Sequence, residues 1–476
     1  MIQLTIHKDT PQNNNIILLS DPTCPFIRYG LNEEEDAYVR QQIANKAKQV
    51  AINKNGYWIF IQIMDEKTAL NKEKENMRRG ASKIHGWICQ QNIRSITVVD
   101  TVNNDKMAYA FVEGLVLTNY QFLKYVKKKE EKQYSLSEVF VVGDSIKQDE
   151  VDILNNILFS VYKTRDLINE PANILNSVQL AHEIKSMADG SGLKVQVLDK
   201  SEIEKLKMGG ILSVNKGSVE EPTFSIIEWK PENAHNKQPV VLVGKGLVYD
   251  TGGLSLKPTT NSMDYMKCDM SGGAAVAATL YAVARSNLPV YVIGLVPSTD
   301  NRISASAYAP GDIITMYDGT TVEVMNTDAE GRLILADALS YAKKYNPELV
   351  IDMATLTGAA HRAIGEQAMV GMGNASRETM EKLKECGESV FERIAEFPFW
   401  DEYVEFIKSD IADLKNIGGE YAGAITAGKF LEFFTDYPYI HLDIAGPAYI
   451  KTTDAYRTKG GTGIGVRLLF EFLRKL

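Results

Sequence analysis

The chain has 476 residues, of which 45% are hydrophobic and 24% charged, and its formal net charge is −9. This length predicts more than one domain, and the composition is typical of a globular protein rather than a disordered or fibrous one. The acidic total argues against nucleic-acid binding, which usually requires a basic face.

Neither a targeting signal nor a membrane segment is expected. The segment Met1–Thr10 lacks the basic-then-apolar pattern of a secretory signal, and no stretch reaches the roughly 18 uninterrupted apolar residues of a membrane helix. The four cysteines are widely spaced, which is typical of reduced thiols in an intracellular protein. We therefore expect a soluble, cytoplasmic protein.

The amino-terminal part contains isolated strand and helix signals. Dense apolar and β-branched runs predict strands at Tyr57–Ile63 and Glu138–Gly143. Apolar residues at helical spacing over Asp149–Val161 predict a helix that connects this part to the rest. The charge run at Lys127–Lys132 is more typical of a solvated helix end or loop than of an anion-binding patch.

From about residue 165, predicted strands and helices alternate. Nearly all-apolar runs, typical of strands buried on both faces, lie at Phe224–Trp229, Val240–Val243, Val290–Val296, Leu349–Met353, Ala368–Met372 and Tyr439–Ile444. Helical patterns lie at Ser271–Ala284, Leu333–Lys344, Glu378–Ile394, Ala424–Phe434 and Val466–Lys475.

This alternation predicts an α/β fold whose carboxyl-terminal domain has a mostly parallel central sheet flanked by helices. A smaller amino-terminal α/β domain precedes it. We place the amino-terminal domain at residues 1–148, the linking helix at residues 149–168 and the carboxyl-terminal domain at residues 169–476.

Four carboxylates lie in three segments that follow predicted strands or precede predicted helices. The segments are Val240–Gly253, with Lys245 and Asp250; Met266–Gly273, with Asp269; and Asn326–Leu333, with Asp328, Glu330 and Arg332. Taken singly, each aspartate before a helix is at least as typical of a helix cap. Ligands of parallel sheets bind at the carboxyl ends of the strands, so the four carboxylates are expected to converge there.

Converging carboxylates repel one another unless a cation neutralises them, which predicts a divalent metal. Oxygen ligands suit Mn²⁺ or Mg²⁺, and Zn²⁺ also accepts carboxylates. The chain has six histidines, none of them in the three segments, so a histidine-based zinc site is not expected. Four carboxylates supply enough oxygens for two ions at the ~3.5–4 Å separation of two-metal sites.

Together the three segments resemble the leucyl aminopeptidase family of di-metal peptidases, also called cytosol aminopeptidases or the M17 peptidase family. The resemblance rests on NTDAEGRL at Asn326–Leu333 and VGKGLVYDTGG at Val243–Gly253. Supporting similarities are RDLINEPAN at Arg165–Asn173, ATLTGA at Ala354–Ala359, AGAITA at Ala422–Ala427 and HLDIAG at His441–Gly446. The resemblance covers roughly residues 150–476 and makes the carboxyl-terminal domain the catalytic one.

The resemblance implies two metal sites that share ligands. A tightly held ion would be bound by Lys245, Asp250, Asp269 and Glu330. A more exchangeable ion would be bound by Asp250, Asp328 and Glu330. Lysine as a ligand requires a neutral amine, which burial and two nearby dications favour. The ions would be Mn²⁺ or Zn²⁺, with Mg²⁺ a further candidate.

The resemblance also implies the other parts of the site. Lys257 would stay charged and polarise the scissile carbonyl, and Arg332 would hold a bicarbonate ion that acts as general base. Met266, Thr355 and Gly358 match positions that line the pocket for the first side chain. Water acidified by the metals would attack the carbonyl.

The expected function is therefore that of a leucyl aminopeptidase, a metalloexopeptidase that releases leucine and other neutral residues from peptides with a free amino terminus. Two alternatives stay open. One is a Cys-Gly-type dipeptidase of thiol turnover. The other is a DNA-binding regulatory member of the family, for which the Lys124–Lys132 cluster gives weak support. The resemblance further implies a homohexamer.

Overall fold

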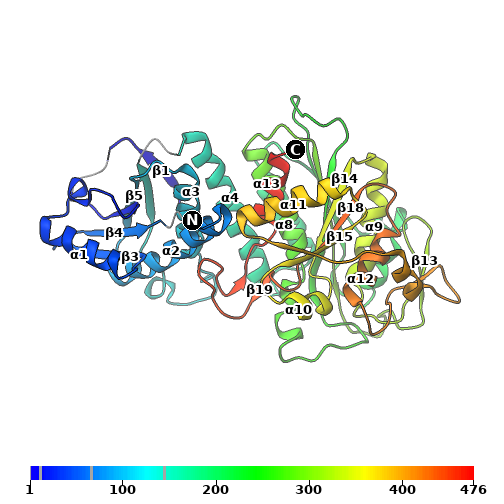
Figure 1. Cartoon of the computed structure of the whole chain (residues 1–476). Coiled ribbons are helices and arrows are strands. Elements are labelled where there is room, and N and C mark those ends of the chain that lie inside the picture. Colours follow the sequence, from blue (N-terminus) through cyan, green and yellow to red (C-terminus); the bar gives the residue numbers. More distant parts are fainter. Residues whose placement is uncertain (1, 10–12, 65–67, 143–145) are drawn as a thin grey trace. The chain divides into compact units, whose positions relative to one another are not determined.

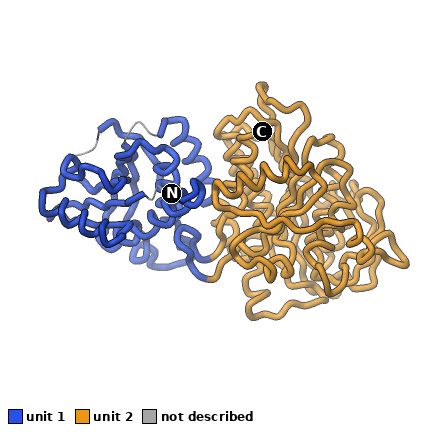
Figure 2. The backbone as a smooth tube through the Cα atoms, in the orientation of Figure 1, with its two compact units in different colours: residues 1–162, 452–459 blue, residues 163–451, 460–476 orange. Residues whose placement is uncertain are grey.

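The computed structural model describes residues 2–9, 13–64, 68–142 and 146–476. These residues form two compact units (Figure 2). Unit 1 comprises residues 1–162 and 452–459, and unit 2 comprises residues 163–451 and 460–476. The boundary lies inside one continuous helix, α4 (Gln148–Asn169), where the sequence predicts a linking helix.

Unit 1 is built on a six-stranded sheet with the order β1-β6-β5-β2-β4-β3. The strands, in chain order, are β1 (Leu4–His7), β2 (Ile16–Ser20), β3 (Gln49–Asn53), β4 (Trp58–Ile63), β5 (Ser95–Asp100) and β6 (Glu138–Val142). All neighbours are parallel except β3 and β4. The strands predicted at Tyr57–Ile63 and Glu138–Gly143 correspond to β4 and β6, and Gly143 lies outside the described residues.

Helices α1 (Glu33–Ala44), α2 (Leu70–Gln90) and α3 (Asp105–Thr118) complete unit 1. α1 begins where the Asn32 side chain accepts a hydrogen bond from the backbone N–H of Glu35 and the Glu35 carboxylate accepts one from the backbone N–H of Asn32. This reciprocal pair is a capping box, which satisfies two backbone donors at the helix start. The charge run at Lys127–Lys132 includes a short exposed 3₁₀ turn, Lys129–Glu131, as predicted for a solvated segment.

A segment from late in the chain, residues 452–459, belongs to unit 1 and contacts α2 through an ion pair and a hydrogen bond. The Arg79 guanidinium donates from Nη1 and Nη2 to the two carboxylate oxygens of Asp454, at 2.7 and 3.1 Å. The Tyr456 hydroxyl, only 1% exposed, donates to Oε2 of the buried Glu75 at 2.8 Å. Unit 1 is therefore not a continuous stretch of sequence.

Unit 2 is built on a nine-stranded sheet with the order β16-β15-β18-β14-β9-β11-β8-β7, and β10 pairs with β11. The strands, in chain order, are β7 (Lys194–Leu198), β8 (Thr223–Trp229), β9 (Val240–Gly244), β10 (Gly246–Asp250), β11 (Val292–Asn301), β14 (Leu349–Ala354), β15 (Met369–Gly373), β16 (Ile394–Glu396) and β18 (Tyr439–Asp443). The central strands β18, β14, β9 and β11 are parallel. β8 and β15 pair antiparallel with β11 and β18 at either side.

Helices cover both faces of this sheet (Figure 1). α5 (Ser177–Ala188), α8 (Ser271–Arg285), α11 (Arg377–Val390) and α13 (Val466–Arg474) form one group, and α7 (Gly209–Asn215), α9 (Gly331–Ala342) and α12 (Gly423–Glu432) form the other. Alternate strand residues face opposite sides, so Val241 and Val243 of β9 join the core under α9. The predicted α/β class with a mostly parallel, helix-covered sheet is confirmed.

The remaining elements of unit 2 are short. They include α6 (Lys200–Lys205), α10 (Gly358–Ile364), a three-stranded sheet of β12 (Ile313–Thr315), β13 (Thr321–Glu323) and β17 (Leu414–Lys415), and the pair β19 (Tyr449–Ile450) and β20 (Gly460–Gly461). The 3₁₀ helix η3 (Met263–Cys268) stands just before α8.

Two predicted elements are wrong at their ends. The helix predicted at Glu378–Ile394 stops at Val390, because Phe391 takes a left-handed conformation with φ 58° and the chain then enters β16. The strand predicted at Val290–Val296 begins at Val292 and continues to Asn301. Its polar extension is fully buried beside β10.

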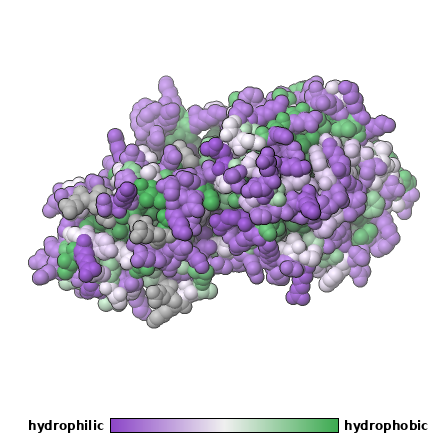
Figure 3. Space-filling model, turned by 90° about the horizontal axis from the view of Figure 1, so that it is seen from above, coloured by the Kyte–Doolittle hydropathy of each residue, from purple (hydrophilic) through white to green (hydrophobic). Residues whose placement is uncertain are grey.

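Hydrophilic residues cover most of the face drawn in Figure 3, and hydrophobic residues form separate patches on it. Within the described ranges, no helix is both long enough and apolar enough to cross a membrane. All four cysteines, namely Cys24, Cys89, Cys268 and Cys386, are free thiols.

Candidate metal centre and active site

The predicted site residues come together at the carboxyl ends of the parallel strands of unit 2. Lys245 directly follows β9, Asp250 is the last residue of β10, and Thr355 directly follows β14. Asp269 stands between η3 and α8. This is the edge at which parallel α/β sheets bind their ligands.

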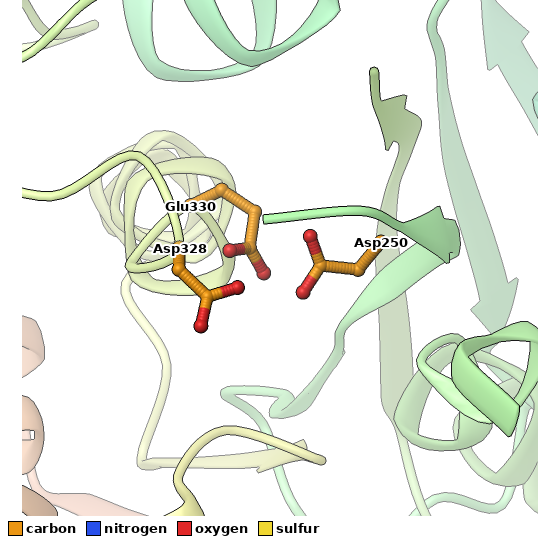
Figure 4. A group of neighbouring side chains, drawn as sticks. All are labelled: Asp250, Asp328 and Glu330. Carbon is orange, nitrogen blue, oxygen red and sulfur yellow. The ribbon is translucent and has the colours of Figure 1, made fainter. Parts of the chain in front are cut away.

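Three carboxylates form the centre of the site. Asp250, Asp328 and Glu330 each offer an oxygen, and these oxygens lie within 4.8 Å of one another. Figure 4 shows the three carboxylates pointing toward one another, with Asp328 and Glu330 from the segment that enters α9 and Asp250 from the opposite side. Asp250 and Glu330 are only 1% and 2% exposed, so they share an environment that water does not screen.

Two lysines join the carboxylates into one network. Lys245 Nζ lies 2.9 Å from Asp269 Oδ2 and 3.0 Å from Glu330 Oε1. Lys257 Nζ lies 2.8 Å from Asp250 Oδ2 and 2.5 Å from Asp328 Oδ1. The fourth carboxylate, Asp269, is thus linked to the other three through Lys245.

The network shifts the pKa of every member. Burial and the Glu330 carboxylate raise the pKa of Asp250 well above its usual range and that of Asp328 to about 6, although Lys257 opposes both shifts. Burial also raises the pKa of Asp269, against the effect of Lys245. Burial alone would raise the pKa of Glu330, but Lys245 and Lys257 outweigh it and hold that pKa below its usual value.

The two lysines are affected in the opposite sense. Burial by itself lowers the pKa of each ammonium group, but the surrounding carboxylates outweigh it and raise the pKa of both Lys245 and Lys257. Among these carboxylates, therefore, both lysines carry a positive charge at neutral pH. The positive charge of a divalent ion beside Lys245 would lower the pKa of its ammonium group and so favour the neutral amine that can act as a ligand.

Two further polar groups, of which the sequence did not single out Asn301, hold the carboxylates in place. The Asn301 side chain donates from Nδ2 to Asp250 Oδ1 at 2.9 Å and to the Thr327 carbonyl at 3.0 Å. The Thr355 hydroxyl donates to Asp269 Oδ1 at 2.6 Å. Thr355 is predicted to line the substrate pocket, and the structure gives it this additional contact.

The side chains of this cluster are suitable ligands for divalent metal ions. Glu330 Oε2 is buried and has no hydrogen-bond partner among the described residues, so a strong acceptor points into the cluster without a donor. Three converging carboxylates supply the oxygen ligands that hard or borderline dications prefer.

Arg332 lies beside the cluster, in the first turn of α9, and is 6% exposed. Its Nη1 donates to the Asn416 carbonyl at 2.8 Å, while Nε has no hydrogen-bond partner in the described part of the chain. Burial lowers the pKa of Arg332 to about 10, so the guanidinium stays charged at neutral pH. It is not among the described residues that line the adjacent cavity.

A cavity of about 390 Å³ opens onto the cluster. Its walls include the three residues predicted for the first side chain, Met266, Thr355 and Gly358. They also include residues that the sequence did not indicate, namely Asn261, Tyr265, His361, Arg362, Tyr449 and Lys451. These residues come from the loop before η3, from η3 itself, from α10, and from β19 and the residue after it, and no local motif connects these segments to the metal segments.

Comparison with known proteins identifies the family. Residues 162–470 match the model of the cytosol aminopeptidase family, catalytic domain. A probable cytosol aminopeptidase of Chlorobium phaeobacteroides is 43% identical over 427 residues, which cover 85% of this chain and 84% of that protein. One from Chloroherpeton thalassium is 53% identical over 313 residues, which cover 65% of this chain and 61% of that protein.

Solved structures are similar over nearly the whole chain. A mutant of tomato leucine aminopeptidase aligns with a TM-score of 0.88 and 27% identity, covering 100% of this chain and 97% of that one. The bottromycin maturation enzyme BotP in complex with Mn aligns with a TM-score of 0.85 and 28% identity, covering 97% of this chain and 99% of that one.

The fold and the carboxylate cluster, taken with these similarities, define a metal-dependent aminopeptidase. The chain belongs to the cytosol aminopeptidase family. Neither of the alternatives raised by the sequence, the Cys-Gly-type dipeptidase and the DNA-binding regulator, is supported by these similarities.

Proposed function

We propose that this enzyme is a leucyl-type aminopeptidase that uses two divalent ions to release leucine and other neutral residues from peptides with a free amino terminus. The observation that carries the proposal is the convergence of Asp250, Asp328 and Glu330, with Asp269 linked to them through Lys245. A carboxylate cluster of this kind beside a cavity is suited to metal-assisted hydrolysis rather than to nucleophilic catalysis by a side chain.

The ligand assignment is the one that the resemblance to the family implies. One ion would be held by Lys245, Asp250, Asp269 and Glu330, and the other by Asp250, Asp328 and Glu330. When bound, two such ions lower the pKa of a shared water and polarise the scissile carbonyl. Oε2 of Glu330, which has no hydrogen-bond partner in the described part of the chain, supports the role of this residue as a shared ligand.

The protein's own groups position the substrate and move protons. Lys257, whose raised pKa keeps it charged, would donate to the carbonyl oxygen as negative charge develops there. Arg332 would hold a bicarbonate ion that would supply a general base, and its buried Nε, which has no hydrogen-bond partner among the described residues, supports an anion at this place. Met266, Thr355 and Gly358 would surround the first side chain.

Further parts of the proposal concern the whole protein. The ions would be Mn²⁺ or Zn²⁺, with Mg²⁺ as a further candidate, because oxygen-rich sites accept several dications. Catalysis would lie in residues 169–476, joined by the helix at 149–168 to an amino-terminal domain at 1–148. The enzyme would act in the cytoplasm as a homohexamer. Size-exclusion chromatography with light scattering tests the hexamer, and a monomeric mass would contradict it.

The test of function is hydrolysis of Leu-p-nitroanilide by protein stripped of metal with a chelator, before and after addition of Mn²⁺ or Zn²⁺. We expect activity that depends on the added ion and is absent with an N-acetylated substrate. The control variant Asp328→Asn keeps the shape of the side chain and removes its charge. Failure of every dication to restore hydrolysis, although the ion binds, would contradict the proposal.

A further inference from the structure

The outer wall of the active-site cavity carries positive charge that the metal cluster does not use. Among the described residues that line the cavity, Arg362 and Lys451 are cations outside the carboxylate network, and Glu366 is the carboxylate there. Arg362 belongs to α10, the helix that begins at Gly358. A substrate that enters this cavity therefore meets two cations and one carboxylate besides the groups of the carboxylate network.

The two cations differ in their surroundings. Lys451 is engaged within the protein, since Nζ donates to Asn261 Oδ1 at 2.8 Å and lies 5.0 Å from the centre of the Tyr265 ring. Arg362 is exposed, and within the described ranges its guanidinium has neither an ion pair nor a hydrogen bond. An arginine with no partner in the protein keeps all five N–H donors for a ligand.

Arg362 also has a defined position in the cavity. Its Nη1 lies 3.1 Å from the place that a Cβ atom on residue 358 would occupy. The guanidinium therefore covers Gly358, which lines the proposed pocket for the first side chain. A side chain that extends along this wall would reach the guanidinium before it reached bulk water.

We propose that Arg362 binds a carboxylate of the substrate, namely the side chain of an acidic first residue, so that the enzyme releases glutamate and aspartate as well as neutral residues. This inference rests on the proposed aminopeptidase function. A planar guanidinium pairs with a carboxylate through two parallel hydrogen bonds, which gives direction as well as attraction. The aliphatic stem of the arginine can still pack against leucine, so neutral residues are not excluded.

The carboxylate at the far end of a dipeptide has the same chemistry but a different position. It lies on the leaving-group side of the scissile bond, whereas Gly358 belongs to the proposed pocket for the first side chain. The position of Arg362 over Gly358 therefore favours the side chain of the first residue. The two sources can be separated by substrates that carry only one of the two carboxylates.

The experiment compares kcat/KM for Glu-p-nitroanilide and Leu-p-nitroanilide with the full chain loaded with Mn²⁺. In Arg362→Met the ratio of Glu to Leu turnover should fall roughly two- to fivefold, because an ion pair to an exposed arginine is lost. In Arg362→Lys, which keeps the charge without the planar fork, the fall should be smaller. Arg377→Met removes an exposed arginine that does not line the cavity and should leave the ratio unchanged.

Three outcomes are decisive. A Glu-to-Leu ratio that is the same in wild type and Arg362→Met, while Leu-p-nitroanilide is hydrolysed, overturns this inference and leaves the aminopeptidase function standing. A loss in Arg362→Met that appears for Leu-Gly but not for Leu-Gly-amide moves the carboxylate to the far end of the substrate and overturns the assignment. If wild type hydrolyses neither anilide under any metal, the proposed function fails and this inference fails with it.

Discussion

Gly331 and Lys245 approach each other so closely that residue 331 has no room for a side chain. A Cβ atom on residue 331 would lie 2.6 Å from Lys245 Nζ and 2.6 Å from its Cε. Gly331 is the first residue of α9 and directly follows Glu330, to which the same Nζ group is bound at 3.0 Å. The start of the helix and the position of the amine are therefore coupled.

This coupling predicts that Gly331→Ala weakens both metal binding and the fold. The clashing atoms belong to a buried ammonium group that pairs with Asp269 and Glu330, so moving it away should also lower the free energy of unfolding, by about 1–3 kcal/mol. The displaced amine leaves Asp269 and Glu330 without their shared partner. Isothermal titration with Mn²⁺ should show at least about a tenfold loss of affinity, about 1.4 kcal/mol. Wild-type affinity would refute the role of Lys245 as a ligand.

A second glycine, Gly272, lies against backbone rather than against a side chain. A Cβ atom on Gly272 would lie 1.9 Å from the Met353 carbonyl oxygen, which is backbone of β14 and cannot rotate away. Gly272→Ala should therefore force α8 away from the sheet and destabilise unit 2 by about 2–3 kcal/mol. Urea unfolding followed by circular dichroism measures this loss. Gly86→Ala, in the middle of α2 with nothing within 4 Å, is the matched control and should gain about 0.5–1 kcal/mol.

The position of Lys257 predicts that one substitution separates catalysis from metal binding. Its ammonium bridges Asp250 and Asp328, two proposed ligands of the exchangeable ion, and so competes with that ion for the same oxygens. Lys257→Met should lower kcat by about 10²–10³, as expected for a lost oxyanion donor, yet bind the second Mn²⁺ more tightly. Arg377→Met controls for the change in net charge. Equal or weaker Mn²⁺ binding in Lys257→Met would show that the ammonium does not compete.

The shifted pKa values predict that metal binding releases protons in a pH-dependent manner. Asp328, with a pKa of about 6, is largely protonated below that pH, so an ion that binds there must displace a proton. Lys245, whose pKa is raised, must also lose a proton to become a ligand. Affinity for Mn²⁺ should therefore fall as the pH is lowered, by about tenfold per unit near pH 7.5 and more steeply below pH 6. Titration in two buffers of different ionisation enthalpy counts the protons. Affinity that does not change with pH would exclude both displacements.

The sequence predicted those parts of the fold in which buried residues are also apolar residues. β9 and β14 are apolar throughout because both faces are covered, and their ends could be placed to within a residue. The end of β11 was not predicted, because Ser298 to Asn301 are polar and would belong to a loop if they were exposed. They are strand because β10 pairs with them and because Asn301 bonds to Asp250 and Thr327.

The site, too, contains residues that the sequence indicated and residues that it did not. The segments with Asp250, Asp269 and Asp328 could be found because each places a carboxylate at the end of a strand or the start of a helix. The contribution of Asn301 could not be found, since nothing in its neighbours distinguishes it from a loop asparagine. Arg362 was not predicted for a different reason. It is an exposed helical residue, and the cavity that residues of α10 and β19 both line shows what it faces.

The return of residues 452–459 to unit 1 bears on how the chain is made. A ribosome releases the amino-terminal sheet long before it synthesises Asp454 and Tyr456, the partners of Arg79 and Glu75. Until then α2 presents a charged arginine and a carboxylate with part of their final contacts missing. The sheet of unit 1 thus emerges before unit 2, but unit 1 is completed only after residues 163–451 of unit 2 have been synthesised.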